Sequence, residues 1–172
     1  MISKKVEKVI LKQIQNEEQS SRIYMAMASW CEVNGFPGAA KFLYAHSDEE
    51  RLHMTKLIKY LNDKGGYATL QSLEMPGTKY KSLLDIFEQI LKHEQFITQS
   101  INSLYETAFT EKDYTTGQFL QWYIMEQIEE ESMFKGILDK FRLAGNEKGG
   151  LFMLDKELDA LGMAKVGAGN QA

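Results

Sequence analysis

The sequence predicts an all-α protein: a four-helix bundle with one long crossover and a short fifth C-terminal helix. Long stretches of the 172 residues are rich in Leu, Ile, Met, Glu, Gln and Lys, which favour helices over strands. The only two prolines, Pro37 and Pro76, lie where the helical periodicity has already stopped. Apolar residues make up 44% of the chain, enough for one substantial core, so we expect a single domain over residues 1–172.

The first two helices are predicted by apolar residues that recur at helical spacing, over about 4–33 and about 38–64. The intervening sequence Asn-Gly-Phe-Pro-Gly, residues 34–38, interrupts the pattern, and the pair Gly65-Gly66 ends the second helix. Because only a few residues connect them, these helices should form an antiparallel hairpin.

The third and fourth helices form a second predicted hairpin, over about 82–109 and from an N-cap at Asp113 to about Ala144. The connection between the two hairpins, about residues 65–81, is much longer. About 16 extended residues span about 50 Å, whereas a helix of about 28 residues is about 42 Å long. This segment can therefore return along the whole bundle.

The C-terminal part predicts a short amphipathic helix over about 151–164, followed by a glycine-rich flexible tail over about 166–172. Leucines give the helix one apolar side, and these are Leu151, Leu154, Leu158 and Leu161. This side could be covered by a partner subunit or by the helix's own bundle.

Composition and charge narrow the classes of function. The formal net charge of −4 argues against nucleic-acid binding, and the lysines within residues 4–12 recur at the spacing of a solvated helix face. The single cysteine, Cys31, excludes an intramolecular disulfide and any metal site built from several cysteines. Charged residues from Lys4 onward argue against a secretory leader, and no apolar run is long enough for a membrane span. We therefore expect a cytoplasmic protein.

Each long helix carries an apolar stripe, and a carboxylate interrupts each stripe near its middle. The four interrupting residues are Glu17, Glu50, Glu94 and Glu130. They lie about 12 to 17 residues from the helix starts, so they meet at one height whichever way each helix runs. For one helix alone, exposure to water would be the better interpretation, because Glu is seldom buried unpaired. Because carboxylates interrupt all four stripes at the same height, we expect the four side chains to be buried.

Four buried carboxylates cannot stay ionised together unless cations compensate for desolvation and mutual repulsion. Glu50 and His53 are three residues apart and project from one helical turn. Carboxylates with a single imidazole suit iron or manganese, and shared carboxylates could bridge two such cations. His46 lacks comparable support, and we interpret it as a satisfied core or interface histidine.

These residues resemble the ferroxidase centre of the bacterial non-haem ferritins over essentially the whole chain. The matching positions are Glu17, Tyr24, the stretch Glu-Glu-Arg-Leu-His at 49–53, Glu94, and the stretch Glu-Gln-Ile-Glu-Glu at 126–130. The resemblance implies a ferritin-like four-helix bundle that binds two irons per subunit. One iron would be held by Glu17, Glu50 and His53. The other would be held by Glu50, Glu94 and Glu130, with Glu50 bridging.

Other residues match neighbours of this centre. Gln127 and Tyr24 resemble the family's nearby glutamine and tyrosine, and Trp122 is expected close by, as packing. The resemblance also implies a third iron site, with ligands Glu49, Glu126, Glu129 and the shared Glu130. From the sequence alone the first three of these lie off the core stripe, and a solvated acidic face explains them equally well.

The chain differs from three related families at residues or segments that those families need. These differences argue against haem binding and favour the bacterial non-haem ferritins. Haem-binding bacterioferritins have a methionine where this chain has Arg51, and a second Glu-x-x-His where it has Gln127 and Glu130. Rubrerythrin-like peroxidases need four cysteines for an extra iron module, and the DNA-protecting mini-ferritins lack a fifth helix. We therefore expect iron but no haem.

The resemblance implies an iron storage protein with ferroxidase activity. Fe(II) would be oxidised to Fe(III) by O2 or hydrogen peroxide and stored as a hydrated ferric oxide in a hollow homo-oligomeric shell of twenty-four subunits. Two alternatives stay open. One is a di-iron oxidase or peroxide-scavenging enzyme without storage, and the other is a structural bundle whose acidic residues bind no metal.

Overall fold

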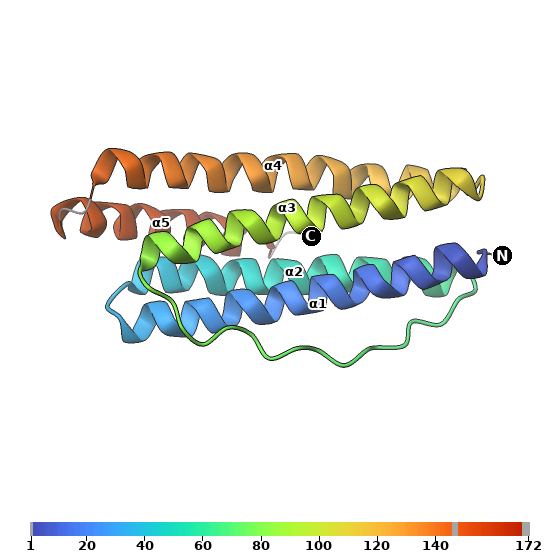
Figure 1. Cartoon of the computed structure of the whole chain (residues 1–172), viewed down its shortest axis with the longest axis horizontal. Helices are drawn as coiled ribbons and strands as arrows, with labels where there is room; N and C mark the ends of the chain where they lie inside the picture. Colours follow the sequence, from blue (N-terminus) through green and yellow to red (C-terminus); the bar gives the residue numbers. More distant parts are fainter. Residues whose placement is uncertain (1, 146–147, 170–172) are drawn as a thin grey trace.

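The computed structural model describes residues 2–145 and 148–169, which form five helices and no strand. The helices are α1 (Lys4–Val33), α2 (Pro37–Asp63), α3 (Leu83–Thr110), α4 (Tyr114–Ala144) and α5 (Lys148–Gly169). The first four lie side by side in a bundle, and α5 packs against its side near one end (Figure 1). This confirms the predicted fold class, and the first four helices match their expected bounds to within one residue. None of the described helices combines the length and apolar character that crossing a bilayer requires.

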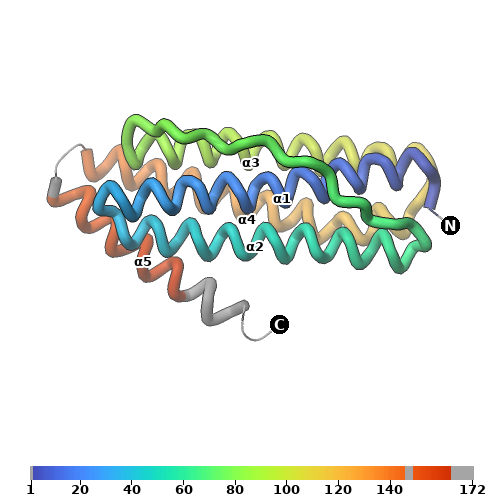
Figure 2. Tube along the Cα trace, turned by 90° about the horizontal axis from the view of Figure 1, so that it is seen from below, coloured from blue at the N-terminus to red at the C-terminus, as the bar shows by residue number. Residues whose placement is uncertain are grey.

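The crossover between α2 and α3 runs along the full length of the bundle beside α1 (Figures 1 and 2). Side chains of α1 hold its backbone in place. Gln15 Nε2 donates to the Ser72 carbonyl at 2.7 Å. Gln19 accepts from Glu74 N–H at 3.0 Å and donates to the Glu74 carbonyl at 3.1 Å. These hydrogen bonds attach the crossover to α1. Because the crossover returns along the whole bundle, α2 and α3 run in the same direction (Figure 1).

Side-chain caps and left-handed residues set the helix ends. Ser3, Ser82 and Asp113 each accept a hydrogen bond from a backbone N–H three residues later, which satisfies a donor of the first turn. The first hairpin turns at Gly35, whose φ of 83° suits glycine. The second turns at Lys112, whose φ of 58° places a side chain in the same left-handed region.

The N-terminus of α2 is capped by a residue of α5. Phe36 provides no side-chain cap, but Asp155 accepts hydrogen bonds from Gly38 N–H at 3.1 Å and Ala39 N–H at 2.8 Å. A Cβ atom on Gly38 would lie 1.9 Å from the Asp155 carbonyl oxygen, so only glycine permits this close approach. The capping contact fixes α5 on the bundle.

The apolar side of α5 is covered by its own subunit. Leu154 and Leu158 are buried in the core, and Leu151 and Leu161 pack against it. The helix is also longer than predicted, because it begins at Lys148 and continues to Gly169. The flexibility predicted for residues 166–172 stays a prediction. Residues 170–172 of that predicted tail lie outside the described part.

The core consists of two apolar clusters. One surrounds Phe42, Phe87 and Phe134 near the α4–α5 end, and the other surrounds Ile10, Leu57 and Leu104 at the opposite end. The predicted stripes run in steps of three and four from Val6 to Cys31, from Phe36 to Tyr60, from Leu83 to Ala108 and from Leu120 to Phe141. All their residues are buried except Phe36 and Tyr60, which are half-buried. Between the clusters, every stripe turns polar. The helical periodicity therefore places a polar layer across the middle of the bundle.

Candidate metal centre

Four carboxylates form the centre of this polar layer, one from each long helix. They are Glu17 of α1, Glu50 of α2, Glu94 of α3 and Glu130 of α4, and none is more than 4% exposed. Each lies on the buried stripe of its helix, so the same periodicity that packs the core also brings these groups together. Their burial was predicted from the sequence and is confirmed.

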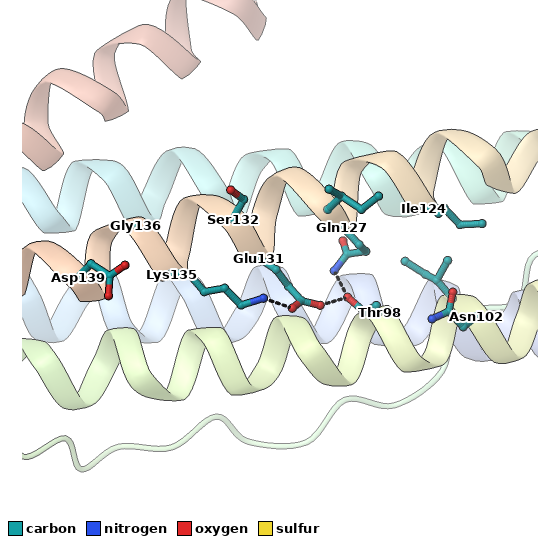
Figure 3. Close-up of a pocket in the computed structure, with 11 residues that line it drawn as sticks. Thr98, Asn102, Ile124, Gln127, Glu131, Ser132, Lys135, Gly136 and Asp139 are labelled. Atoms are coloured by element: carbon teal, nitrogen blue, oxygen red, sulfur yellow. Dashed lines mark hydrogen bonds and ion pairs between the residues drawn. The ribbon is translucent and has the colours of Figure 1, made fainter.

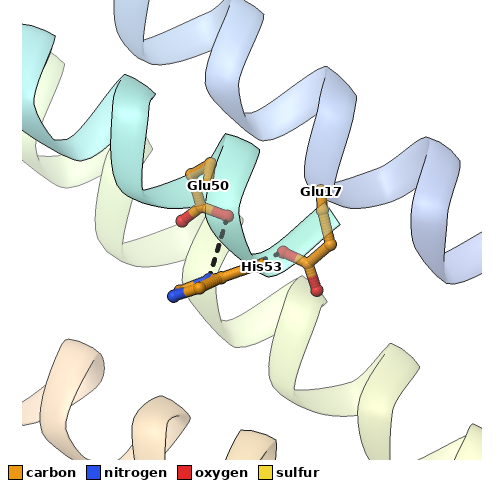
Figure 4. Close-up of side chains that lie close together, drawn as sticks. All are labelled: Glu17, Glu50 and His53. Carbon is orange, nitrogen blue, oxygen red and sulfur yellow. Dashed lines mark ion pairs between the residues drawn. The ribbon is translucent and has the colours of Figure 1, made fainter. Parts of the chain in front are cut away.

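Glu17, Glu50 and His53 face one another across α1 and α2 (Figure 4). His53 Nδ1 lies 3.5 Å from Glu50 Oε2 and 3.9 Å from Glu17 Oε2. These separations are long for hydrogen bonds. Two atoms that each bind a tetrahedral cation at about 2.1 Å are about 3.4 Å apart. The three side chains are therefore close enough together to hold a common cation.

Glu94 is held by a hydrogen bond to each of its carboxylate oxygens. Tyr24 Oη donates to Oε1, and Gln127 Nε2 donates to Oε2 at 3.0 Å. Tyr24 comes from α1 and Gln127 from α4, so Glu94 is oriented from two sides of the bundle. The structure thus places both of these predicted residues beside the carboxylate layer.

Burial makes ionisation of this layer unfavourable. Desolvation, reinforced by the charge of Glu50, raises the pKa of Glu17 well above its usual range. Desolvation and the charge of Glu94 likewise raise the pKa of Glu50. The pKa of Glu94 is raised to about 7, mainly by desolvation and in spite of its two hydrogen-bond donors. Bound cations would remove this penalty, because they favour the ionised carboxylates.

A chain of polar groups between α1 and α3 orients Glu17. Asn16 Nδ2 donates to Ser100 Oγ at 2.8 Å, Ser100 Oγ donates to Gln13 Oε1 at 2.6 Å, and Gln13 Nε2 donates to Glu17 Oε1 at 2.7 Å. Gln13 lies on the buried stripe of α1, but its contact with Glu17 was not predicted from the sequence. Its position four residues before Glu17, on the same helical face, was the signal that could have revealed it.

His53 is also held from the side of α4. Tyr123 Oη donates to the His53 backbone carbonyl at 2.7 Å. The rings of His53 and Trp122 meet edge to face, with centroids 5.2 Å apart, and Lys56 Nζ lies 3.4 Å from the centroid of the Trp122 ring. Trp122 therefore packs beside the centre, as expected from the sequence.

The acidic residues flanking the layer are only partly brought together. Glu49 lies close to His46 and Glu130, and it also lies close to His53 and Glu126. In each group the ligand atoms are within 4.8 Å of one another. Glu129 is exposed and belongs to neither group among the described residues.

His46 lies in the core, but one of its two ring nitrogens is not satisfied by the protein. Nδ1 lies 3.0 Å from the Phe42 carbonyl oxygen. Nε2 has no hydrogen-bond partner in the described part of the chain and lies 3.6 Å from Glu130 Oε2. The interpretation of His46 as a satisfied core or interface histidine therefore agrees with its burial and with Nδ1 but is wrong for Nε2, because spacing locates a side chain and does not account for both ring atoms.

A groove between α3 and α4 leads from the surface toward the layer (Figure 3). Its volume is about 710 Å³, and Gln127 and Thr98 lie at its inner wall. Glu131 crosses it, accepting from Thr98 Oγ1 at 2.8 Å and pairing with Lys135 at 2.9 Å. Gln127 lines the groove and also donates to Glu94, so one buried side chain lies between the groove and the carboxylate layer.

Chemically, the centre offers several carboxylate oxygens and imidazole nitrogen, with no thiolate, since Cys31 lies in the apolar core. This set of ligands suits a hard divalent or trivalent transition metal, such as iron or manganese. Carboxylates shared between neighbouring positions can bridge two cations.

Comparisons with known proteins agree with this geometry. A family model described as a ferritin-like domain matches residues 7–144. The bacterial non-haem ferritin of Campylobacter jejuni is 46% identical over 165 residues, which is 96% of this chain and 99% of that protein. The bacterial non-haem ferritin of Escherichia coli is 47% identical over 149 residues, covering 87% of this chain and 90% of the relative.

Solved structures give the same result. An open-pore ferritin of the hyperthermophilic archaeon Archaeoglobus fulgidus superimposes with a TM-score of 0.90 at 37% identity, covering 92% of this chain and 96% of that one. Sequence identity over nearly the whole chain and agreement of the fold point to one family. The chain therefore belongs to the ferritin family.

Proposed function

We propose that this protein is an iron storage protein with ferroxidase activity, which oxidises Fe(II) at a dinuclear centre within each subunit. The observation that carries the proposal is the buried layer of four carboxylates, because such a layer can stay ionised only when cations compensate its charge. The names of the similar proteins, which are ferritins, support the same activity.

The two iron positions share Glu50. Glu17, Glu50 and His53 bind one Fe(II), and Glu50, Glu94 and Glu130 bind the other. Carboxylates stabilise Fe(III) over Fe(II), because their negative charge offsets the higher charge of the oxidised ion. Two Fe(II) ions supply two electrons, which with two protons reduce O2 to hydrogen peroxide or reduce hydrogen peroxide to water.

Tyr24 and Gln127 act by holding Glu94. The pKa of Tyr24 is raised by burial and by the charge of Glu94, so its hydroxyl keeps its proton and donates to the carboxylate. Gln127 restrains the second oxygen of Glu94. Both contacts reduce the rearrangement that Glu94 undergoes when iron binds.

A third iron site lies beside the pair, formed by Glu49, Glu126 and Glu129 with Glu130 shared. Its support is the resemblance to the bacterial ferritins, together with the proximity of Glu49 to the Glu130 and Glu126 carboxylates. Iron leaves the dinuclear centre through this site and accumulates as a hydrated ferric oxide.

The mineral is held in a hollow homo-oligomeric shell of twenty-four subunits in the cytoplasm, without haem, nucleic acid or membrane partners. The exposed apolar side chains support assembly, because a monomer would leave them in water. Examples are Leu70 and Met75 in the crossover and Leu143 and Phe152 near the end of the bundle.

The proposal is tested by loading the metal-free protein with Fe(II) in air and measuring mass and iron per particle. A large hollow particle that retains many irons per subunit is expected. A small oligomer that oxidises Fe(II) without retaining it would instead indicate a di-iron oxidase or peroxide-scavenging enzyme. Neither oxidation nor uptake would indicate a structural bundle.

A further inference from the structure

His46 sits in an aromatic cage that fixes its ring. Its centroid lies 4.2 Å from that of Phe42, 5.3 Å from that of Phe134 and 5.7 Å from that of Tyr24. The residue is 1% exposed. Because the ring has little room to rotate, the directions of its two nitrogens are set by packing.

The hydrogen bond at Nδ1 determines which nitrogen is available. The Phe42 carbonyl can only accept, so Nδ1 carries a hydrogen and donates to it at 3.0 Å. In the neutral imidazole, Nε2 then carries a lone pair. Histidines that bind metals commonly donate their other N–H to a backbone carbonyl in this way, which orients the ring.

The lone pair of Nε2 faces acidic groups. Glu130 Oε2 lies 3.6 Å away, beyond hydrogen-bond length, and Glu49 offers an oxygen within 4.8 Å of a ring nitrogen of His46 and of a carboxylate oxygen of Glu130. A nitrogen lone pair and a carboxylate oxygen repel each other unless a cation or a proton lies between them. Their separation is close to the roughly 3.4 Å expected for two ligands of one tetrahedral cation.

We propose that His46, Glu49 and Glu130 form a metal position of their own, with His46 Nε2 as its nitrogen ligand. This inference rests on the proposed function and deepens it. Glu130 is shared with the dinuclear centre, and Glu49 is half-buried on the other side. The position shares Glu49 and Glu130 with the all-carboxylate third site implied by resemblance, and its nitrogen ligand distinguishes the two.

Zinc, which has no redox chemistry, provides the direct test. Crystals of the metal-free assembled protein are soaked in Zn²⁺, and anomalous scattering is measured at the zinc edge. We expect density about 2.1 Å from His46 Nε2, in addition to density in the dinuclear centre. Density on Glu126 and Glu129 away from His46, or none beyond the dinuclear centre, would overturn the inference and leave the proposed function intact. An empty dinuclear centre would count against the proposed function itself.

Matched histidine variants give a second readout in solution. His46→Gln removes the imidazole, whereas His93→Gln makes the same change at a histidine that hydrogen-bonds Ser20 Oγ at 2.8 Å and lies in no metal-ligand group of the described residues. In calorimetric zinc titrations, His46→Gln should bind one zinc fewer per subunit than the wild type, and His93→Gln should match the wild type. Equal zinc binding by His46→Gln and the wild type would contradict the assignment. The crystal soak uses the wild type, so it decides the matter even if a variant misfolds.

Discussion

Glu94 is the residue whose ionisable side chain is least compatible with its fully buried position. It is 0% exposed, yet it lies among three other carboxylates, and its α3 stripe is otherwise apolar. A neutral or apolar residue would pack there at lower free-energy cost, so its presence is best explained by cation binding.

Glu94→Gln therefore tests the iron site without changing the volume of the side chain. We expect Fe(II) oxidation, followed by stopped-flow absorbance, to slow by roughly 100-fold, because the second iron loses a ligand. Glu88→Gln, an exposed position on the same helix, is the matched control and should oxidise iron at the wild-type rate. Wild-type rates in Glu94→Gln would remove this residue from the mechanism.

The raised pKa values of the layer predict how the metal-free protein responds to pH. Burial raises the pKa of Glu94 from 4.5 to about 7 and also raises the pKa values of Glu17 and Glu50. In the unfolded chain these groups lose their protons near pH 4.5, before the folded protein does. Their favourable contribution to folding is complete below about pH 4.5 and is lost as the pH rises to 7 and above.

Thermal unfolding of the chelator-treated protein should therefore show a lower Tm at pH 8 than at pH 5. Glu94→Gln should reduce the difference, because one of the titrating groups is gone. Added Zn²⁺ should reverse it at pH 8, because the metal stabilises the ionised carboxylates. A metal-free Tm that is unchanged or higher at pH 8 would contradict the burial of these groups.

Single side chains were only partly predictable from the sequence. The position of Glu94 followed from helical spacing, since residues three and four apart share a face. The contact of Tyr24 and Gln127 with Glu94, and the open nitrogen of His46, depend on rotamers and on the relative rotation of neighbouring helices. Spacing along one helix carries no information about either.

Among the secondary structure elements, α5 departs furthest from expectation. Its apolar side packs on its own bundle, and Asp155 caps α2 from more than one hundred residues away. No local pattern predicts this contact, because the capping residue is remote in sequence. The sequence shows only that α2 begins at Pro37 and that a glycine follows it. Neither residue indicates which side chain caps the helix.

Asp155→Ala should lower stability by about 1 kcal/mol, because two N–H groups of α2 lose their acceptor. Asp159→Ala is the matched control on the same helix, since Asp159 forms only a partly exposed ion pair with Lys41. Denaturant unfolding of the metal-free variants measures the difference. Equal losses in the two variants would mean that the cap contributes no more than a surface charge pair.

The turn between α3 and α4 places Lys112 in a left-handed conformation that glycine adopts more easily. Lys112→Gly should raise the free energy of unfolding by about 1 kcal/mol. Lys112→Ala removes the charge but keeps the Cβ atom, and it should give no such gain. Chemical denaturation of both variants distinguishes relief of backbone strain from loss of charge. Equal changes in the free energy of unfolding would show that backbone strain at residue 112 is not the cause.

The complete subunit combines two hairpins, a crossover and a docked fifth helix around one polar layer. The four-helix bundle and the position of the polar layer along its axis were predictable, because each of the four apolar stripes is interrupted by a carboxylate near the middle of its helix. The path of the crossover was predicted only as a length, whereas its contacts with Gln15 and Gln19 of α1 required the structure. The shell remains a proposal, since it depends on contacts between subunits.

Iron itself provides the decisive measurement. Crystals of the metal-free protein would be soaked in Fe(II) without oxygen, and anomalous scattering would be recorded on both sides of the iron edge. We predict two iron positions inside each bundle, one at Glu17, Glu50 and His53 and the other at Glu50, Glu94 and Glu130. Iron bound only at exposed carboxylates, with the buried layer empty, would contradict this account.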